Sequence, residues 1–158
     1  MFGLTSLRQT KTSTIRIIRL MNRADLQRLT RIRLREARVL LKNGHFEGAY
    51  YLLGYAVECA FKACIARQTR RYDFPDRKLV NDIYTHDLNK LLNVSGLEPE
   101  HRRESTRNPI FELNWTIVKD WSEQSRYTAG VNRAKAADFR TAVVSRRNGI
   151  LPWLQRWW

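Results

Sequence analysis

One histidine beside a carboxylate is the clearest candidate for chemistry in this sequence. His86 is followed directly by Asp87, and a carboxylate next to an imidazole can fix its tautomer and raise its basicity. The alternative is structural: Asp87 caps a short helix, and His86 anchors the preceding loop through hydrogen bonds. We favour the structural interpretation and keep His86 as a candidate catalytic residue.

A second candidate is an acid–base pair inside an apolar stretch. Glu58 and Lys62 lie four residues apart within residues 49–66, the spacing at which two side chains meet on one helix face. We expect a structural ion pair at the edge of the domain or at a dimer seam, because breaking a buried pair is costly. A ligand contact of Glu58 is the alternative. Tyr55 is expected at the edge of the core, with a base-stacking role as the alternative.

The charge of the chain favours polyanionic partners. The 158 residues contain 29 Lys and Arg against 15 Asp and Glu, a formal net charge of +14, so nucleic-acid binding with salt-sensitive affinity is a reasonable expectation. The alternative is an ordinary solvated helix surface. The residues that would form a phosphate-binding stripe are Arg31, Arg35, Arg38, Arg67, Arg70 and Arg71.

Other functional classes receive little support. The two cysteines, Cys59 and Cys64, are too few for a disulfide framework and lack the paired spacing of a zinc site. We therefore expect a reducing, cytoplasmic environment and neither a metal nor a cofactor. No apolar run reaches the roughly 18 residues that a membrane-spanning helix needs, so stable membrane insertion is not expected.

The apolar spacing predicts helices and no strands. Residues 1–21 are expected to be a disordered basic arm or a mis-assigned start, and residues 22–158 one helical domain. We predict an all-α fold, an up-and-down four-helix bundle with additional short helices. Expected helices cover residues 25–43, closed by Gly44, and residues 47–67. Others begin after Asp87, Asn108 and Asn132, and the last of them carries Arg146, Arg147 and Asn148.

The same patterns predict which side chains lie inside. The helix after Asn108 is expected to bury Ile110, Phe111, Asn114, Ile117, Val118 and Trp121. His101 is flanked by Arg102 and Arg103 and is expected at the solvated surface. Trp153 and Trp157 fall on one helical face and are expected to close the bundle or a dimer interface, with a position at a lipid surface as the alternative.

The central motifs resemble the HEPN family. Residues 49–66 read AYYLLGYAVECAFKACIA, LLKNGHFEG precedes them, THDLNKLL follows at residues 85–92, and Trp121 stands ahead of Arg126 and Tyr127. The resemblance covers about residues 24–158. It implies a compact up-and-down helical bundle, frequent dimers, a role linked to RNA or nucleotides and, in many bacterial members, pairing with a small nucleotidyltransferase in toxin–antitoxin modules. Candidate ligand-binding residues are Glu58, Lys62, Tyr55, His86, Asp87 and Arg126.

The catalytic motif of that family is incomplete in this chain. Active members cut RNA without metal, using an Arg and a His about four to six residues apart in the last long helix, where imidazole moves protons and guanidinium holds phosphate. Here Pro152, Trp153 and Leu154 stand where a His should follow Arg147, and Arg107 has no His downstream. Arg38 and His45 have a similar spacing, but at the end of the first helix, and we interpret that as coincidence.

Three interpretations of function follow. The main one is a non-catalytic HEPN-like module that binds RNA, a nucleotide or a partner nucleotidyltransferase, in a toxin–antitoxin or defence system and as a homodimer. The enzymatic alternative is a ribonuclease toxin with an atypical site, in which folding brings Arg147 or Arg107 to His86. The third is a structural subunit that neutralises or scaffolds an acidic nucleotidyltransferase.

Overall fold

The computed structural model describes residues 22–68 and 81–158, which contain helices and no strands. The expected all-α class is therefore confirmed for this part of the chain, while the finer up-and-down arrangement remains a prediction. The proposed arm at residues 1–21, Arg70 and Arg71 lie outside the described residues. No helix within the described ranges is long and apolar enough to cross a membrane.

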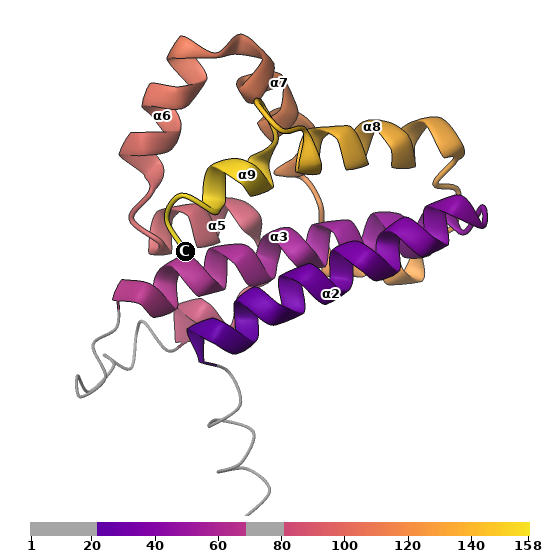
Figure 1. The fold of residues 1–158 in the computed structure, drawn as a ribbon, viewed down its shortest axis with the longest axis horizontal. Coiled ribbons are helices and arrows are strands. Elements are labelled where there is room, and N and C mark those ends of the chain that lie inside the picture. Colours follow the sequence, from indigo (N-terminus) through magenta and orange to yellow (C-terminus); the bar gives the residue numbers. More distant parts are fainter. Residues whose placement is uncertain (1–21, 69–80) are drawn as a thin grey trace, which may run out of the picture.

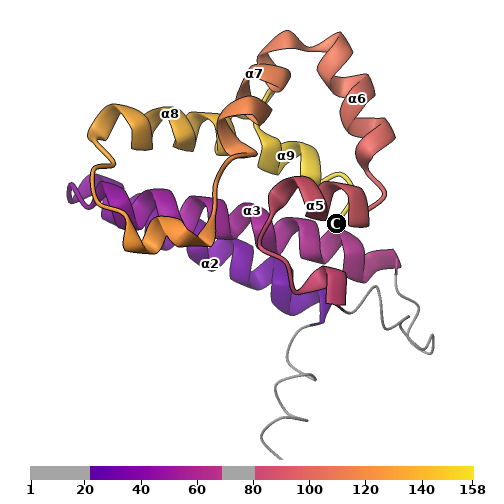
Figure 2. The ribbon, with the colours of Figure 1, turned by 180° about the vertical axis from the view of Figure 1, so that it is seen from behind.

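Two long helices form the base of the fold. Helix α2 (Arg23–Lys42) runs beside α3 (Phe46–Gln68), as Figures 1 and 2 show from opposite sides. The side chain of Asn22 accepts a hydrogen bond from the amide of Asp25 (3.0 Å), so the expected N-cap is confirmed. Gly44 has a φ of 80° in the turn between the helices, which is the left-handed residue that the sequence predicted.

Helix α3 is the central helix, as expected. It is buried along most of its middle. Helices α2, α5 (Leu88–Val94), α8 (Arg133–Val144) and α9 (Ile150–Leu154) all pack against it. Gly54 lies directly under the indole ring of Trp121: a Cβ atom added there would stand 2.2 Å from the ring atoms. Glycine is required at this position because the tryptophan occupies the space of a side chain.

The short helix α5 (Leu88–Val94) begins where Asp87 predicted it. The Asp87 carboxylate accepts hydrogen bonds from the amides of Asn89 (2.9 Å) and Lys90 (3.2 Å). The capping interpretation of Asp87 is therefore confirmed. Leu88, Leu91 and Leu92 are buried, so this helix closes one side of the core.

Helix α6 (Glu98–Arg107) was not expected, and it corrects the placement of His101. The His101 side chain is buried, and its ring packs against Phe111, Trp115 and Trp153 at centroid distances of 5.4, 4.8 and 5.8 Å. Arg102 and Arg103 point to solvent and form ion pairs with Glu98 and Glu100, because a helix turns neighbouring residues to different faces. Burial lowers the pKa of His101, which favours its neutral form.

Helix α7 (Pro109–Val118) begins as predicted, with the Asn108 side chain accepting from the amide of Phe111 (3.2 Å). Its buried face is Phe111, Asn114, Trp115 and Val118. The expectation that Ile110 and Ile117 lie inside was wrong, since they are 57% and 37% exposed. The buried residues already form a complete i, i+3, i+4, i+7 stripe against the core, and Ile110 and Ile117 lie outside that stripe.

The C-terminal third closes the fold. A short 3₁₀ helix, η1 (Glu123–Tyr127), leads to α8 (Arg133–Val144), whose N-cap is Asn132 as expected (side chain to the amide of Lys135, 2.9 Å). Helix α9 (Ile150–Leu154) then buries Trp153 and Leu154, which confirms the core-closing role of this segment. Trp157 is partly buried against the same core.

The turn between α8 and α9 corrects one expectation. Arg146, Arg147 and Asn148 are not in the last long helix, because α8 ends at Val144. Asn148 instead holds the turn against α7: its backbone oxygen accepts from Asn114 Nδ2 (2.8 Å) and its side-chain oxygen from Asn108 Nδ2 (3.0 Å). These bonds to the neighbouring helix replace a further helical turn.

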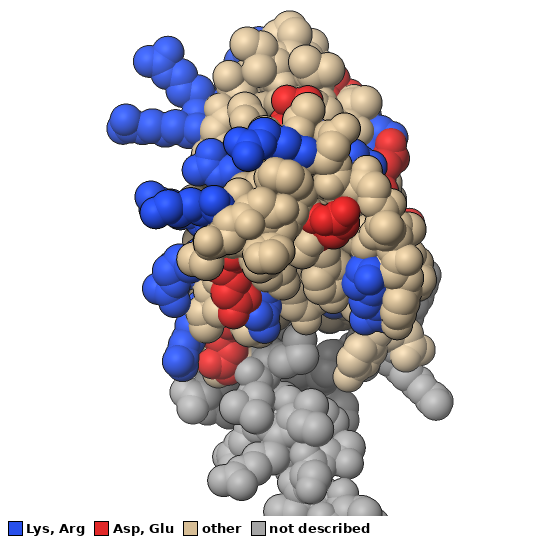
Figure 3. Space-filling view, turned by 90° about the vertical axis from the view of Figure 1, so that its right-hand side faces the viewer, with Lys and Arg blue, Asp and Glu red and all other residues tan. Residues whose placement is uncertain are grey.

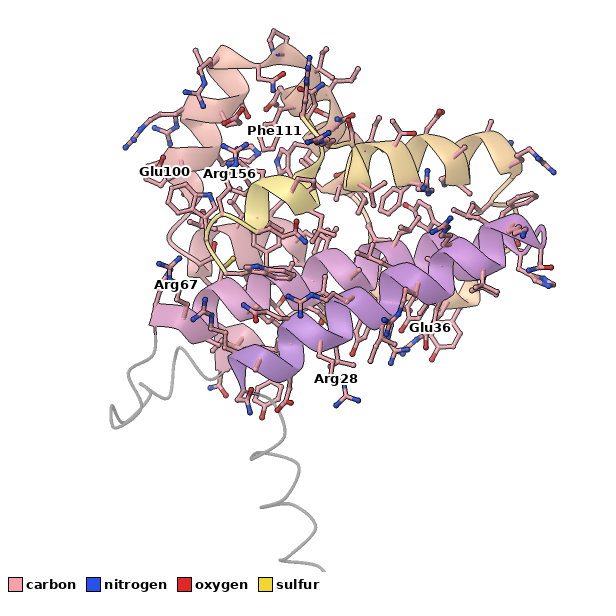
Figure 4. All side chains as sticks on the ribbon, in the orientation of Figure 1. Arg28, Glu36, Arg67, Glu100, Phe111 and Arg156 are labelled. Atoms are coloured by element: carbon pink, nitrogen blue, oxygen red, sulfur yellow. The ribbon has the colours of Figure 1, made fainter. Side chains whose placement is uncertain are left out.

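Contacts with the long helices hold the last residues of the chain. Arg23 and Arg67 donate hydrogen bonds to the backbone oxygens of Trp158 (2.5 Å) and Trp157 (3.2 Å), and the Arg31 guanidinium lies 5.4 Å from the Trp158 ring. Arg156 extends from the end of α9 toward α6 (Figure 4) and lies 3.4 Å from the carboxylate of Glu104. The segment after α9 therefore ties α2, α3 and α6 together.

Candidate functional site

A buried carboxylate joins two of the expected site residues. On α3, Glu58 Oε1 accepts from Lys62 Nζ at 2.7 Å, so the predicted ion pair is confirmed. The second oxygen of Glu58, Oε2, lies 2.9 Å from Nδ1 of His86, which the loop before α5 supplies. The Glu58 side chain is only 2% exposed, whereas the His86 side chain is 44% exposed. The three residues form a chain from the protein interior to the surface.

This geometry determines which nitrogen of His86 is available. A carboxylate accepts hydrogen bonds, so we assign a proton to Nδ1, and in the neutral ring Nε2 then carries the free lone pair. The exposed part of the imidazole borders a polar hollow of about 430 Å³, lined by Thr85, His86, Asp87, Asn89, Lys119, Asp120, Trp121, Ser122 and Glu123. A buried carboxylate behind an imidazole is an arrangement that can orient a general base.

Glu58, not Asp87, is thus the carboxylate that holds His86. The Asp87 carboxylate accepts hydrogen bonds from the first amides of α5. The His86 imidazole contacts the carboxylate of Glu58 instead. No local signal in the sequence links Glu58 with His86, since 28 positions separate them.

Arg107 and Arg147, the expected partners of His86, lie elsewhere. Arg107 is at the end of α6 and pairs with Glu104 at 2.7 Å, while Arg147 is exposed in the turn after α8. Among the described residues, neither is part of the lining of the hollow at His86. The structure therefore joins His86 with Glu58 and Lys62 rather than with either arginine.

Tyr55 and Arg126 also lie outside that hollow. Tyr55 is half-buried beside Tyr51 and the guanidinium of Arg33 (5.8 Å from the ring centroid), which confirms its position at the core edge. Burial raises the pKa of its phenol. Arg126 is exposed, with its guanidinium 4.8 Å from the ring of Tyr127.

The cysteines offer no nucleophile. Cys59 and Cys64 are free and buried in α3. Burial raises the pKa of each thiol to about 12, so the reactive thiolate is scarce near neutral pH. Within the described ranges, no group of three or more His, Cys, Asp and Glu side chains could hold a metal ion.

A second hollow, of about 360 Å³, lies between α2 and α8. We call it the basic groove; its lining is Arg38, Leu41, Lys42, Phe46, Arg133, Ala137, Arg140 and Thr141. Four of these residues are cationic, and no Asp or Glu from residues 22–68 or 81–158 is among them. None of the four forms an ion pair with a carboxylate in those ranges.

Helix geometry explains why these cations meet. Arg38 and Lys42 are one helical turn apart on α2, and Arg133 and Arg140 are two turns apart on α8. The turn after α2 and the start of α8 lie at the same end of the molecule. Figure 3 views that end and shows Lys and Arg side chains gathered along one side of it. The groove thus concentrates positive charge from two separate helices.

Of the four expected stripe arginines that the structure describes, Arg38 is the one that lines the basic groove. Arg31, Arg35 and Arg38 are exposed along α2, and Arg28 on the same helix points away from the fold in Figure 4. Arg67 is exposed at the end of α3, where it holds Trp157. The groove cations that the sequence patterns did not single out are Lys42, Arg133 and Arg140. Lys42 lies one turn after Arg38 on α2, and helical spacing on α8 is the signal that could have indicated Arg133 and Arg140. No family model, curated protein or solved structure matches the chain.

Proposed function

We propose that this protein is a HEPN-like, non-catalytic module that binds RNA through the basic groove and the exposed face of α2. The observation that supports the proposal most directly is the set of four groove cations that have no carboxylate partner within the described residues. Like charges held close together repel, and phosphate groups relieve that repulsion while releasing their own counterions.

The resemblance of the central motifs to the HEPN family extends this proposal. It supports an up-and-down bundle, a homodimer in the cytoplasm, and a small nucleotidyltransferase as a partner in a toxin–antitoxin or defence system. A nucleotide is the smaller ligand of the same chemistry, since it also presents phosphate to arginine and lysine.

A gel shift with the purified chain and end-labelled RNA tests the main proposal. We expect retarded RNA that is released as salt rises. In the variant Arg38→Ala/Arg140→Ala, affinity should fall roughly 10- to 100-fold and the salt slope by about two, because two phosphate contacts are lost.

The matched control is Arg102→Ala/Arg103→Ala, which removes the same charge from α6, where both arginines pair with carboxylates. We expect its affinity to stay within about threefold of the wild type. Equal losses in the two variants would mean that net charge, and not the groove, determines binding. If the RNA is not retarded at any salt concentration, the proposed RNA binding is wrong. The structural-subunit interpretation would then remain, and co-purification with a nucleotidyltransferase would test it.

The hydrogen bond between Glu58 and His86 favours a second candidate, a ribonuclease with an atypical site. In that case the imidazole would accept the proton of a ribose 2′-hydroxyl. The prediction is that wild-type protein cleaves the labelled RNA and that His86→Ala leaves it intact with an unchanged unfolding transition. RNA that remains whole with the wild-type protein, or that is cut equally by His86→Ala, removes His86 from this role.

A further inference from the structure

We propose that Arg133, supported by Phe46, is a stacking platform for one unpaired base, so that the basic groove selects single-stranded over double-stranded RNA. This inference rests on the proposed RNA binding and adds the form of RNA that is recognised. The observation behind it is that the Arg133 guanidinium lies 5.5 Å from the Phe46 ring centroid, inside the lining of the groove.

The two groups differ in how far they are exposed. Phe46 is half-buried at the first residue of α3, so the fold holds its ring in place. Arg133, at the first residue of α8, is exposed. A guanidinium is planar and stacks on aromatic rings. A base can then stack on the solvent side of the guanidinium, or take its place on the ring.

The rest of the groove fits the two parts of a nucleotide. Apolar side chains of Leu41, Phe46 and Ala137 contribute to the lining and suit the face of a base. Arg38 and Lys42 on α2 and Arg140 on α8 lie around them and suit the phosphates on either side. Aromatic and cationic groups combined in one groove are typical of single-strand binding.

Charge alone would favour the opposite selectivity. Duplexes carry about twice the phosphate charge per unit length of a single strand, and a surface that senses only charge gains from that density. Bases in a duplex also cover one another, so their faces cannot reach Arg133 without unstacking. A preference for the single strand therefore reports stacking and not electrostatics.

The test is Arg133→Lys, which keeps the charge and removes the planar group. Dissociation constants would be measured at one salt concentration for a labelled single strand and for a duplex of the same length. Wild-type protein should bind the single strand more tightly. In Arg133→Lys we expect single-strand affinity to fall about tenfold, with duplex affinity within twofold of the wild type. Arg133→Ala should weaken both, because it also removes charge.

Phe46 provides a second and independent variant. Phe46→Leu should lose the preference for single-stranded RNA, and Phe46→Tyr should keep that preference. Thermal unfolding would be recorded for each variant. Lys135→Arg is the control: Lys135 lies over Tyr50 (5.2 Å) outside the groove lining, and its change should leave the preference unaltered.

The outcomes separate the two proposals. Equal effects of Arg133→Lys on both forms of RNA, no effect on either, or a wild-type preference for the duplex would overturn the stacking platform and leave RNA binding in place. Binding of neither form by the wild-type protein would overturn both.

Discussion

Gly54→Ala is expected to lower the free energy of unfolding by about 3 kcal/mol, at the upper end of the cost of overpacking a core. The added Cβ would lie 2.2 Å from the ring of Trp121, and one of the two must move. Neither can move easily, because Gly54 is in the middle of the central helix and Trp121 is buried. Urea unfolding followed by tryptophan fluorescence measures the change.

The higher helix propensity of alanine opposes this loss of stability. The sign of the measured change in the free energy of unfolding is therefore informative. Alanine is favoured over glycine inside a helix by about 1 kcal/mol. Gly48→Ala on the same helix is the matched control, since its Cβ would meet only the flexible end of Leu40 at 3.1 Å. We expect Gly48→Ala to be neutral or stabilising. A Gly54→Ala protein as stable as the wild type would show that Trp121 does not pack as described.

Lys62→Met is the second substitution with a large expected effect. It should lower the free energy of unfolding by about 3 kcal/mol. It leaves the buried Glu58 carboxylate without the ammonium group at 2.7 Å, and removing one partner of a buried pair typically costs about 3–5 kcal/mol. We take the lower value because the other Glu58 oxygen keeps its hydrogen bond from His86. Unfolding in urea again provides the measurement.

A double-mutant cycle separates this effect from ordinary repacking. Glu58→Gln/Lys62→Met removes both charges and keeps an amide oxygen near His86, so we expect it to be more stable than Lys62→Met alone. If the losses of the two single variants simply add, the charges are not coupled, and the ion pair does not explain the stability of this part of α3.

Local signals in the sequence were sufficient for most helix starts. Asn22, Asp87, Asn108 and Asn132 cap the helices that follow them, because a capping side chain bonds amides two or three residues ahead and needs no distant partner. The Glu58–Lys62 pair was predictable for the same reason.

Helix α6 shows where that approach fails. Its sequence, EPEHRRESTR, contains no Ala, Val, Leu, Ile, Met, Phe, Tyr or Trp to mark a buried face. His101 and Glu104 are its buried residues, and the histidine ring packs between aromatic side chains of α7 and α9. An apolar stripe is the main sign of a helix in a sequence, so a helix that packs through a histidine ring is not detected by that sign.

The candidate site was predictable only in part, because its contacts join distant segments. The sequence marked His86 and Glu58 separately, but their contact depends on how the loop before α5 lies against α3. Likewise, Arg38 was expected in a basic stripe, but the groove exists only because α8 brings Arg133 and Arg140 beside α2. Local spacing carries no information about such pairings.

The position of the closing contacts has a consequence for folding during synthesis. Arg23 and Trp158 are 135 positions apart, and Ile150, Leu151, Trp153 and Leu154 belong to the core cluster around α3. A ribosome adding about 5–20 residues per second needs roughly 5–20 s to pass from the end of α3 to residue 158. During that interval the apolar side chains of α3 that pack against α9 stay exposed, so the nascent chain should be more prone to aggregation until translation has passed α9.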